Sequence, residues 1–370
     1  MKRKLGLFLA GMLMATSLVG CTSEQTSYMQ ETKKMSSWES IDSDIKGTVK
    51  VKFPVVEPVA EGQTTPAPVK YDTLNVNFDG KGYTLDGSGK NPKAYVTLNL
   101  KSDKKDVLDI KDVKIYVDSE KVYISKNYFE GIIKSTGQEL PKVLKDVKQE
   151  YILIDGAMGQ TGTATPAEYQ AMEDYIKAMS SPEKKDEMMN KLTKVMEKIN
   201  FDIPVTKTDR TYTVTLTSDQ LLDKALKSMD SIIANSEEII KMLELQDQLK
   251  LTKEDFAELK KSYNEKGKAE MTTGIATAKE MLKGSTITTK ETFGDDTHVV
   301  DMNFKFVVKD MMDMDMTMNQ TSKKSEKRDI VMPKVENSIS MDKYMEKMMP
   351  VEETTPAPAQ TATTPAKKAA

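Results

Sequence analysis

Alternation of apolar and polar residues is the strongest pattern in this chain, and it predicts β-strands with one buried face. Four segments show it: 74–79, 96–101, 113–124 (with a turn at 118–121) and 211–217. In each of them every second residue is apolar, and the residues between are mostly polar. A period of two with one polar face indicates an antiparallel sheet that packs on one side only, because parallel sheets covered on both faces carry continuous apolar runs.

A period near four residues predicts helices in the middle of the chain. These predicted helices cover residues 166–179, 181–199, 218–243, a segment from 252 onward, and 268–283 with a potential break at Gly274. Ser181-Pro182 is typical of a helix start, with a capping residue followed by a first-turn proline. Thr252 and Asp255 have the spacing of a capping box. Strands and helices in separate blocks predict an α+β fold.

A predicted hairpin carries a long apolar face that is rich in methionine. Segments 285–293 and 297–308 flank the turn Gly294-Asp295-Asp296. From residue 300 onward the even positions are apolar, interrupted only by Asp310, and continue past a predicted bend at 309–311 into a second strand. The odd positions are mostly polar. The candidate ligand-binding residues on this face are Met302, Phe304, Phe306, Met312, Met314, Met316 and Met318.

Three interpretations of this face remain open. The residues form a core beneath helices, in a chain that uses methionine where others use leucine. Alternatively they line an adaptable groove for a lipid-like ligand or an apolar peptide, since methionine side chains are flexible and polarizable. A third hypothesis is copper(I) binding, because thioethers select that ion. Asp313 and Asp315 suggest calcium, but acidic pairs without an EF-hand glycine and distal glutamate more often form a solvated face.

Composition argues against nucleic acid binding and against catalysis. The net charge is −3, with 54 basic and 57 acidic residues, and no basic cluster stands out. The single histidine, His298, leaves little from which to build a catalytic triad or a histidine-rich metal site. The chain has no dinucleotide-binding, phosphate-loop or zinc-protease motif. We therefore expect a non-enzymatic protein with no cofactor and no metal site.

The N-terminus predicts export and lipid anchoring. Lys2, Arg3 and Lys4 precede an apolar stretch that is too short for a transmembrane helix. It ends at residues 18–21, Leu-Val-Gly-Cys, which resemble the lipobox of bacterial lipoproteins. The resemblance implies cleavage before Cys21, the chain's only cysteine, and a diacylglyceryl group on it. The alternative is an ordinary signal peptide with an unrelated thiol. Since Thr22 is not aspartate, an outer-membrane location is open in a double-membraned host.

The predicted domain organisation has four parts. Residues 1–20 are the signal peptide, 21–34 a polar lipidated tether, 35–349 one α+β domain, and 350–370 a disordered Thr/Pro/Ala-rich tail. Segments 62–68 and 159–167 share the composition of the tail and are predicted loops. The anchor places the domain on the extracytoplasmic side of the cell membrane.

The layout resembles the LolA/LppX-like lipoproteins. Two local segments carry this likeness: 112–126 is similar to a strand-turn-strand of that group, and 329–333 to its closing strand, which ends in proline. The resemblance covers residues 35–349 and implies a strongly curved antiparallel half-barrel whose concave apolar face is covered by helices and holds acyl chains. No ligand or catalytic motif transfers beyond Cys21, and loops near 57–69 and 155–167 exceed a minimal member.

Two functional hypotheses follow. The first is a membrane-anchored lipoprotein that binds a lipid-like or other apolar ligand between sheet and helices. The second is a structural or protein-interaction lipoprotein with a collapsed core and no ligand. The surroundings of Met312, Met314 and Met316 distinguish them, because an open apolar face is needed for binding and a packed one excludes it.

Overall fold

The computed structural model describes most of the predicted domain. The described residues are 22–55, 70–85, 92–104, 107–118, 121–135, 137–155, 203–246 and 251–348, with isolated residues between 187 and 199. The predicted signal peptide, Cys21, the tail and the Thr/Pro/Ala-rich loops lie outside them. So do the predicted helix at 166–179 and most of the one at 181–199.

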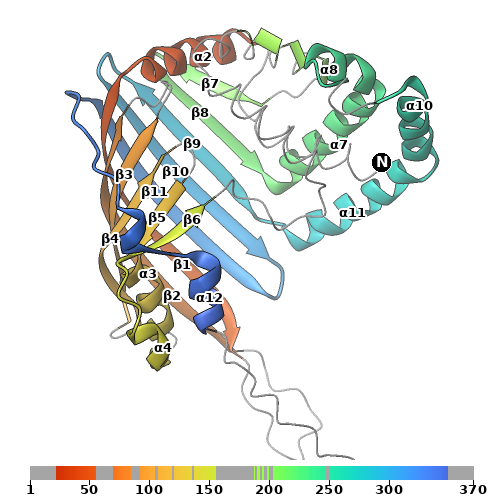
Figure 1. The fold of residues 1–370 in the computed structure, drawn as a ribbon. Helices are drawn as coiled ribbons and strands as arrows, with labels where there is room; N and C mark the ends of the chain where they lie inside the picture. The colour runs from red at the N-terminus through yellow and green to blue at the C-terminus, as the bar shows by residue number, and fades with distance from the viewer. Residues whose placement is uncertain are drawn as a thin grey trace, which may run out of the picture.

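The described residues form an α+β fold built on one sheet of twelve strands (Figure 1). The strands are β1 (Ser40–Val55), β2 (Lys70–Leu85), β3 (Lys93–Ser102), β4 (Asp109–Val117), β5 (Lys121–Ser125), β6 (Tyr151–Asp155), β7 (Val205–Thr208), β8 (Thr211–Thr217), β9 (Thr286–Phe293), β10 (Thr297–Val308), β11 (Met312–Lys324) and β12 (Ser338–Ser340). Their order is β12-β6-β5-β4-β3-β2-β1-β11-β10-β9-β8-β7, and the sheet is open. All neighbours are antiparallel except β12 and β6. The antiparallel sheet and the predicted hairpin are confirmed.

Residues paired across neighbouring strands place one apolar row on one face of the sheet. Leu216 of β8 pairs with Ile287, which pairs with Phe304, which pairs with Met316. Met316 pairs in turn with Val49 of β1. Side chains that pair directly point to the same face, so these residues share it. We call it the methionine face, and the opposite side the outer face.

Helices pack on the methionine face at the β8–β9 side. They are α7 (Ser218–Ala234), α8 (Ser236–Met242), α10 (Lys253–Ser262) and α11 (Lys268–Met281), with a π-helical turn, η1 (Tyr263–Gly267), between α10 and α11. Ile232, Ile239 and Phe256 form a buried core with Leu216. The capping box at Thr252 is confirmed. The single helix predicted over 218–243 is interrupted at Asn235, and Gly274 does not break α11.

A second group of elements covers the other end of the same face. It contains α3 (Lys126–Ser135), α4 (Lys142–Lys145), the short η2 (Val335–Asn337) and α12 (Met341–Met348). Leu144, Ile152 and Tyr344 form its buried core. Ile152 pairs with Ile124 and, through it, with Ile115, which continues the methionine face to this end.

The closing strand predicted at 329–333 is not a strand. The segment crosses the outer face, where Ile330 is buried beside Tyr83. The Tyr83 hydroxyl donates to the carbonyl of Arg328 (2.9 Å) and accepts from its amide (2.7 Å). These two bonds fix the backbone at Arg328, just before the segment, on the outer face.

The expected polar tether is instead a docked helix, α2 (Ser23–Ser36). Thr22 caps the helix with a capping box. The backbone N–H of Gln25 donates to Thr22 Oγ1, and the backbone N–H of Thr22 donates to the side-chain Oε1 of Gln25. Tyr28 and Gln25 are buried against the sheet. The prediction of a free tether was wrong here because a polar sequence can fold when its side chains find hydrogen-bond partners elsewhere in the chain.

Candidate functional site

The hairpin β10–β11 brings the candidate residues together. Met302 pairs with Met318, Phe304 with Met316, and Phe306 with Met314. Asp310 has a left-handed backbone (φ 61°) in the turn at 309–311. The turn pairs Val308 with Met312, so the even-numbered residues of both strands lie on one face of the sheet.

The apolar face extends over β1 and β2. Met314 pairs with Val51 and then Leu74, Met316 with Val49 and then Val76, and Met318 with Gly47 and then Phe78. Position 47 requires glycine, because the Cβ of any other residue would lie only 2.4 Å from the Phe78 ring. The ring therefore lies over the glycine, and the apolar surface continues across β1 without a side chain there.

The seven candidate residues are half-buried rather than enclosed in a core. Met302, Phe304, Phe306, Met312, Met314, Met316 and Met318 all keep part of their surface exposed. None of them belongs to the buried core clusters of the described residues. The rings of Phe304 and Phe306 stack, with centroids 5.9 Å apart. In the described part of the chain, the middle of this face is thus less completely packed than its two ends.

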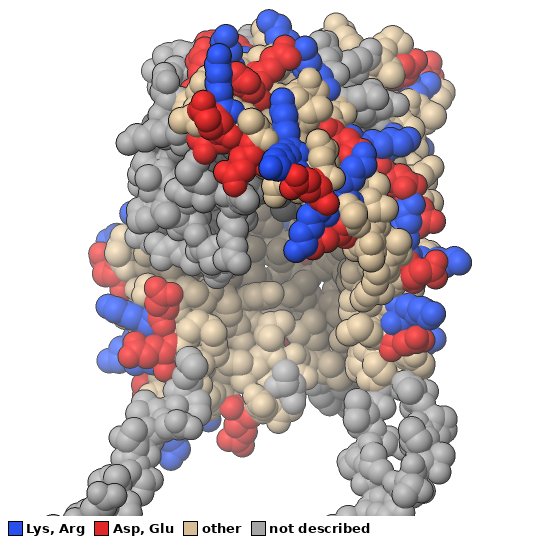
Figure 2. Space-filling view, turned by 90° about the vertical axis from the view of Figure 1, so that its right-hand side faces the viewer, with Lys and Arg blue, Asp and Glu red and all other residues tan. Residues whose placement is uncertain are grey.

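Figure 2 shows a hollow between the helices and the sheet. Lysine, arginine, aspartate and glutamate side chains gather on the helices above it, whereas the described residues that form its floor are uncharged. The sheet lies behind this hollow with the methionine face toward the helices, as the packing of Leu216 and Ile287 against them requires.

Polar residues lie on the methionine face at the α2 end of the strands. His298 Nε2 is 2.9 Å from Glu291 Oε2, and the Tyr28 hydroxyl donates to Glu291 Oε1 at 2.9 Å. The His298 ring stacks on Phe293, with centroids 4.5 Å apart. Burial, and then the nearby Glu291 carboxylate, raise the pKa of Tyr28, so this hydroxyl stays protonated and serves as a donor.

The sequence shows His298 as the only histidine but gives no sign of this cluster. Glu291 and His298 are close because β9 and β10 pair, but Tyr28 is more than 260 residues away in the sequence. No local pattern links α2 to this position on the sheet.

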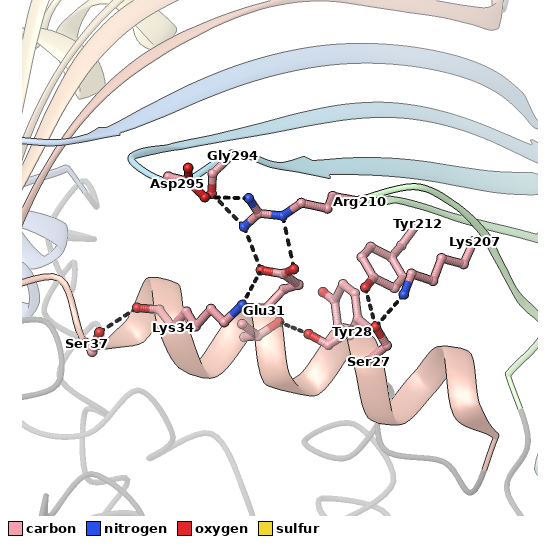
Figure 3. Close-up of polar contacts among 11 residues, drawn as sticks. Ser27, Tyr28, Glu31, Lys34, Ser37, Lys207, Arg210, Tyr212, Gly294 and Asp295 are labelled. Atoms are coloured by element: carbon pink, nitrogen blue, oxygen red, sulfur yellow. Dashed lines mark hydrogen bonds and ion pairs between the residues drawn. The ribbon is translucent and has the colours of Figure 1, made fainter.

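Helix α2 is clamped onto the sheet by polar contacts (Figure 3). Gln25 Nε2 donates to the carbonyl of Ile203 (2.7 Å), and Ser27 Oγ lies 2.7 Å from the Tyr212 hydroxyl. Arg210 donates to both carboxylate oxygens of Glu31, at 3.0 and 2.8 Å. It also reaches the β9–β10 turn, at Asp295 (2.7 Å) and the Gly294 carbonyl (2.8 Å). One guanidinium thus joins α2 to two turns of the sheet.

Replacing Arg210 with alanine is expected to loosen α2 by about 2 kcal/mol, because hydrogen bonds to a charged, largely buried carboxylate are lost. Hydrogen exchange at the α2 amides should become faster while the amides of β10 stay protected. The matched control is Arg328→Ala, which removes the other described arginine, on the outer face. Unchanged α2 exchange in Arg210→Ala would contradict this assignment.

The same clamp has a pH dependence. Hydrogen bonds from Arg210 lower the pKa of Glu31 below its ordinary 4.5. A carboxylate whose pKa is depressed by folding stabilises the fold fully above its ordinary pKa, and this contribution is lost as pH falls through the lowered value. Protection of α2 should therefore decrease in acid. Arg210→Ala should reduce that dependence and leave the smaller effect of Lys34, whose Nζ lies 3.7 Å from Glu31 Oε2.

Asp313 and Asp315, considered above as a calcium pair, lie on the outer face. Asp315 pairs with both Lys50 and Lys305, and Asp313 pairs with Lys52. They are therefore part of a charged ladder. Among the described residues, no group of three or more histidine, cysteine, aspartate or glutamate side chains is arranged to hold a metal ion.

Comparisons with protein families, curated proteins and solved structures identify no match to this chain. The resemblance to LolA/LppX-like lipoproteins and the lipid anchor at Cys21 therefore stay predictions. Within the residues that the structure describes, no helix combines the length and the apolarity needed to cross a bilayer.

Proposed function

We propose that this chain is a membrane-anchored extracytoplasmic lipoprotein that binds the apolar part of a lipid-like ligand over the methionine face. The anchor is the diacylglyceryl group predicted at Cys21. The sheet acts as a strongly curved half-barrel of the LolA/LppX-like kind, with the methionine face as its concave side. The role is non-enzymatic: the protein shields the ligand from water.

One observation carries this proposal, namely the half-buried state of the seven candidate residues between two packed ends. A surface of this kind gains free energy when an acyl chain replaces water on it. Burying about 350 Å² of apolar ligand surface at about 25 cal/mol per Å² supplies about 9 kcal/mol. Micromolar binding needs about 8 kcal/mol, so a single chain is enough in order of magnitude.

Methionine suits this role better than leucine would. Its unbranched side chain adopts many rotamers and its sulfur is polarizable, so the floor can adjust to chains of different shape. Met302, Met314, Met316 and Met318 occupy neighbouring positions on two paired strands, and Phe304 and Phe306 supply rigid surface between them. We infer a site selective for apolar chains in general.

Native mass spectrometry of the protein isolated from its own host tests this function. We expect the lipidated polypeptide together with a lipid adduct that leaves on collisional activation. The bare polypeptide mass would overturn the ligand-binding proposal and favour a structural or protein-interaction lipoprotein. An adduct of copper mass would equally overturn it, in favour of metal binding by the methionine cluster.

A further inference from the structure

The strand ends opposite α2 carry a concentration of exposed large apolar side chains. Five of the ten such side chains among the described residues lie there, between 36% and 60% exposed. We call them the apolar rim: Phe53, Tyr71, Leu221, Met281 and Met311.

Pairing and hydrogen bonds place all five residues at one end of the strands. Pro54 pairs with Tyr71, so Phe53 and Tyr71 share the open end of the β1–β2 pair. Lys52 pairs with Asp313, which puts the turn residue Met311 beside them. In Figure 1, α2 lies at the top and β1 runs down to the opposite end of the sheet, where β2 begins.

The helices add the other two members of the rim. The amide of Lys309 donates to the carbonyl of Met281 (2.8 Å), which ties the end of α11 to the β10–β11 turn. Ser218 Oγ donates to the carbonyl of Leu282 (2.9 Å), which brings the first turn of α7, with Leu221, to the same place.

We propose that the apolar rim docks onto a lipid bilayer and forms the entrance through which an acyl chain reaches the methionine face. The rim borders that face, because Phe53 lies two residues beyond Val51 on β1 and so points to the same side, and Met311 lies in the turn that precedes Met312. A chain passing from a bilayer over Phe53 and Met311 would therefore reach the apolar side chains of the methionine face next.

The polar groups of the rim favour a bilayer as the occupant. Lys52 Nζ lies 4.8 Å above the centre of the Tyr71 ring, and Lys283 and Lys309 are exposed beside Met281 and Met311. Asp310 is the acidic residue of the same turn. Lysine and tyrosine combine an apolar body with a polar tip, which suits the boundary between acyl chains and headgroups.

This inference rests on the proposed function, because an entrance matters only if the methionine face binds a ligand. Docking of the rim onto vesicles is measured separately from ligand binding. In full-length chain carrying Cys21→Ser, the fluorophore NBD is attached at Met311→Cys and, as the matched control, at Val331→Cys. Val331 is 85% exposed and lies on the outer-face segment. Vesicles of phosphatidylcholine with a minor fraction of phosphatidylglycerol should shift the emission of the probe at 311 to the blue. Nitroxide-bearing lipids should quench it, and the probe at 331 should stay unchanged.

Equal responses at both positions, or none at 311, would overturn the proposal. A blue shift at 311 that grows with protein concentration in the absence of vesicles would overturn it in favour of a second copy of the chain. A double variant with Leu221→Ser and Met311→Ser should partition onto vesicles about tenfold more weakly, because two apolar side chains are lost from the contact. Val331→Ser with Val335→Ser, also exposed, should not.

The same rim variant separates this proposal from the proposed function. A fluorescent fatty acid added without vesicles should bind the Leu221→Ser, Met311→Ser protein as it binds wild type, because the methionine face is intact. Loss of vesicle docking with retained fatty-acid binding supports the rim. Retained docking with no fatty-acid binding in either protein would refute the ligand-binding site alone.

Discussion

Replacing Met316 with glutamate is expected to weaken binding of a fluorescent fatty acid by about a hundredfold, because an ionised carboxylate would be covered by an acyl chain with no partner. Met316 is half-buried and lies at the centre of the methionine face, between Val49 and Phe304. Titration of the purified variant, with a thermal unfolding curve beside it, measures the effect.

The neighbouring residue provides a matched control. Thr317 is exposed on the outer face, where its hydroxyl lies 2.8 Å from that of Thr48. Thr317→Glu adds the same charge to the same strand, one residue away, but on the opposite face. It should bind as wild type does. Equal binding by both folded variants would mean that the ligand does not occupy the methionine face.

Replacing Cys21 with serine is expected to abolish lipid modification, so that the protein moves to the soluble fraction or stays unprocessed. The diacylglyceryl group predicted at Cys21 would supply two chains, and stable membrane attachment needs two hydrophobic signals. Metabolic labelling with a radioactive fatty acid and fractionation of host cells measure both effects. Thr22→Ser is the matched control, because serine is also a good helix cap and keeps the cysteine. Normal labelling and processing of Cys21→Ser would refute the anchor.

The strands with strict alternation could be predicted from sequence because their two faces meet different surroundings. In β8, Tyr212 and Leu216 are buried, whereas the threonines between them lie on the outer face. β1 was missed, although it is the central long strand. Ser43 and Gly47 interrupt the apolar half of its pattern, and the apolar surface over Gly47 is completed by Phe78 of the neighbouring strand β2.

Helix α2 could not be predicted from its own sequence. Its sequence has few apolar residues, and local pattern favoured a loose tether. The helix is stable where it lies because Gln25, Ser27 and Glu31 each reach a partner near residues 203–212. Such contacts between distant segments leave no periodic signal in either of them.

The position of the candidate site could be predicted from the sequence, but whether its apolar face is packed or open could not. Alternation alone put the seven residues on one face, and the pairing of β10 with β11 confirms this. Whether that face is packed or open depends on where the helices lie relative to the sheet. The rim was not predicted at all, because its residues, from Phe53 to Met311, come from separate parts of the sequence.

The capping box at Thr22 has a mechanical consequence if Cys21 carries the predicted lipid. Helix α2 begins at Ser23 and is held on the sheet through the contact between Arg210 and Glu31, so a lipid on Cys21 would be separated from the folded body by very few residues. The twelve residues of β10 span about 40 Å at about 3.3 Å per residue. The rim thus stands about one bilayer thickness from α2. A body that carried a lipid at one end and docked through the rim at the other would form a short bridge across a gap between two lipid surfaces.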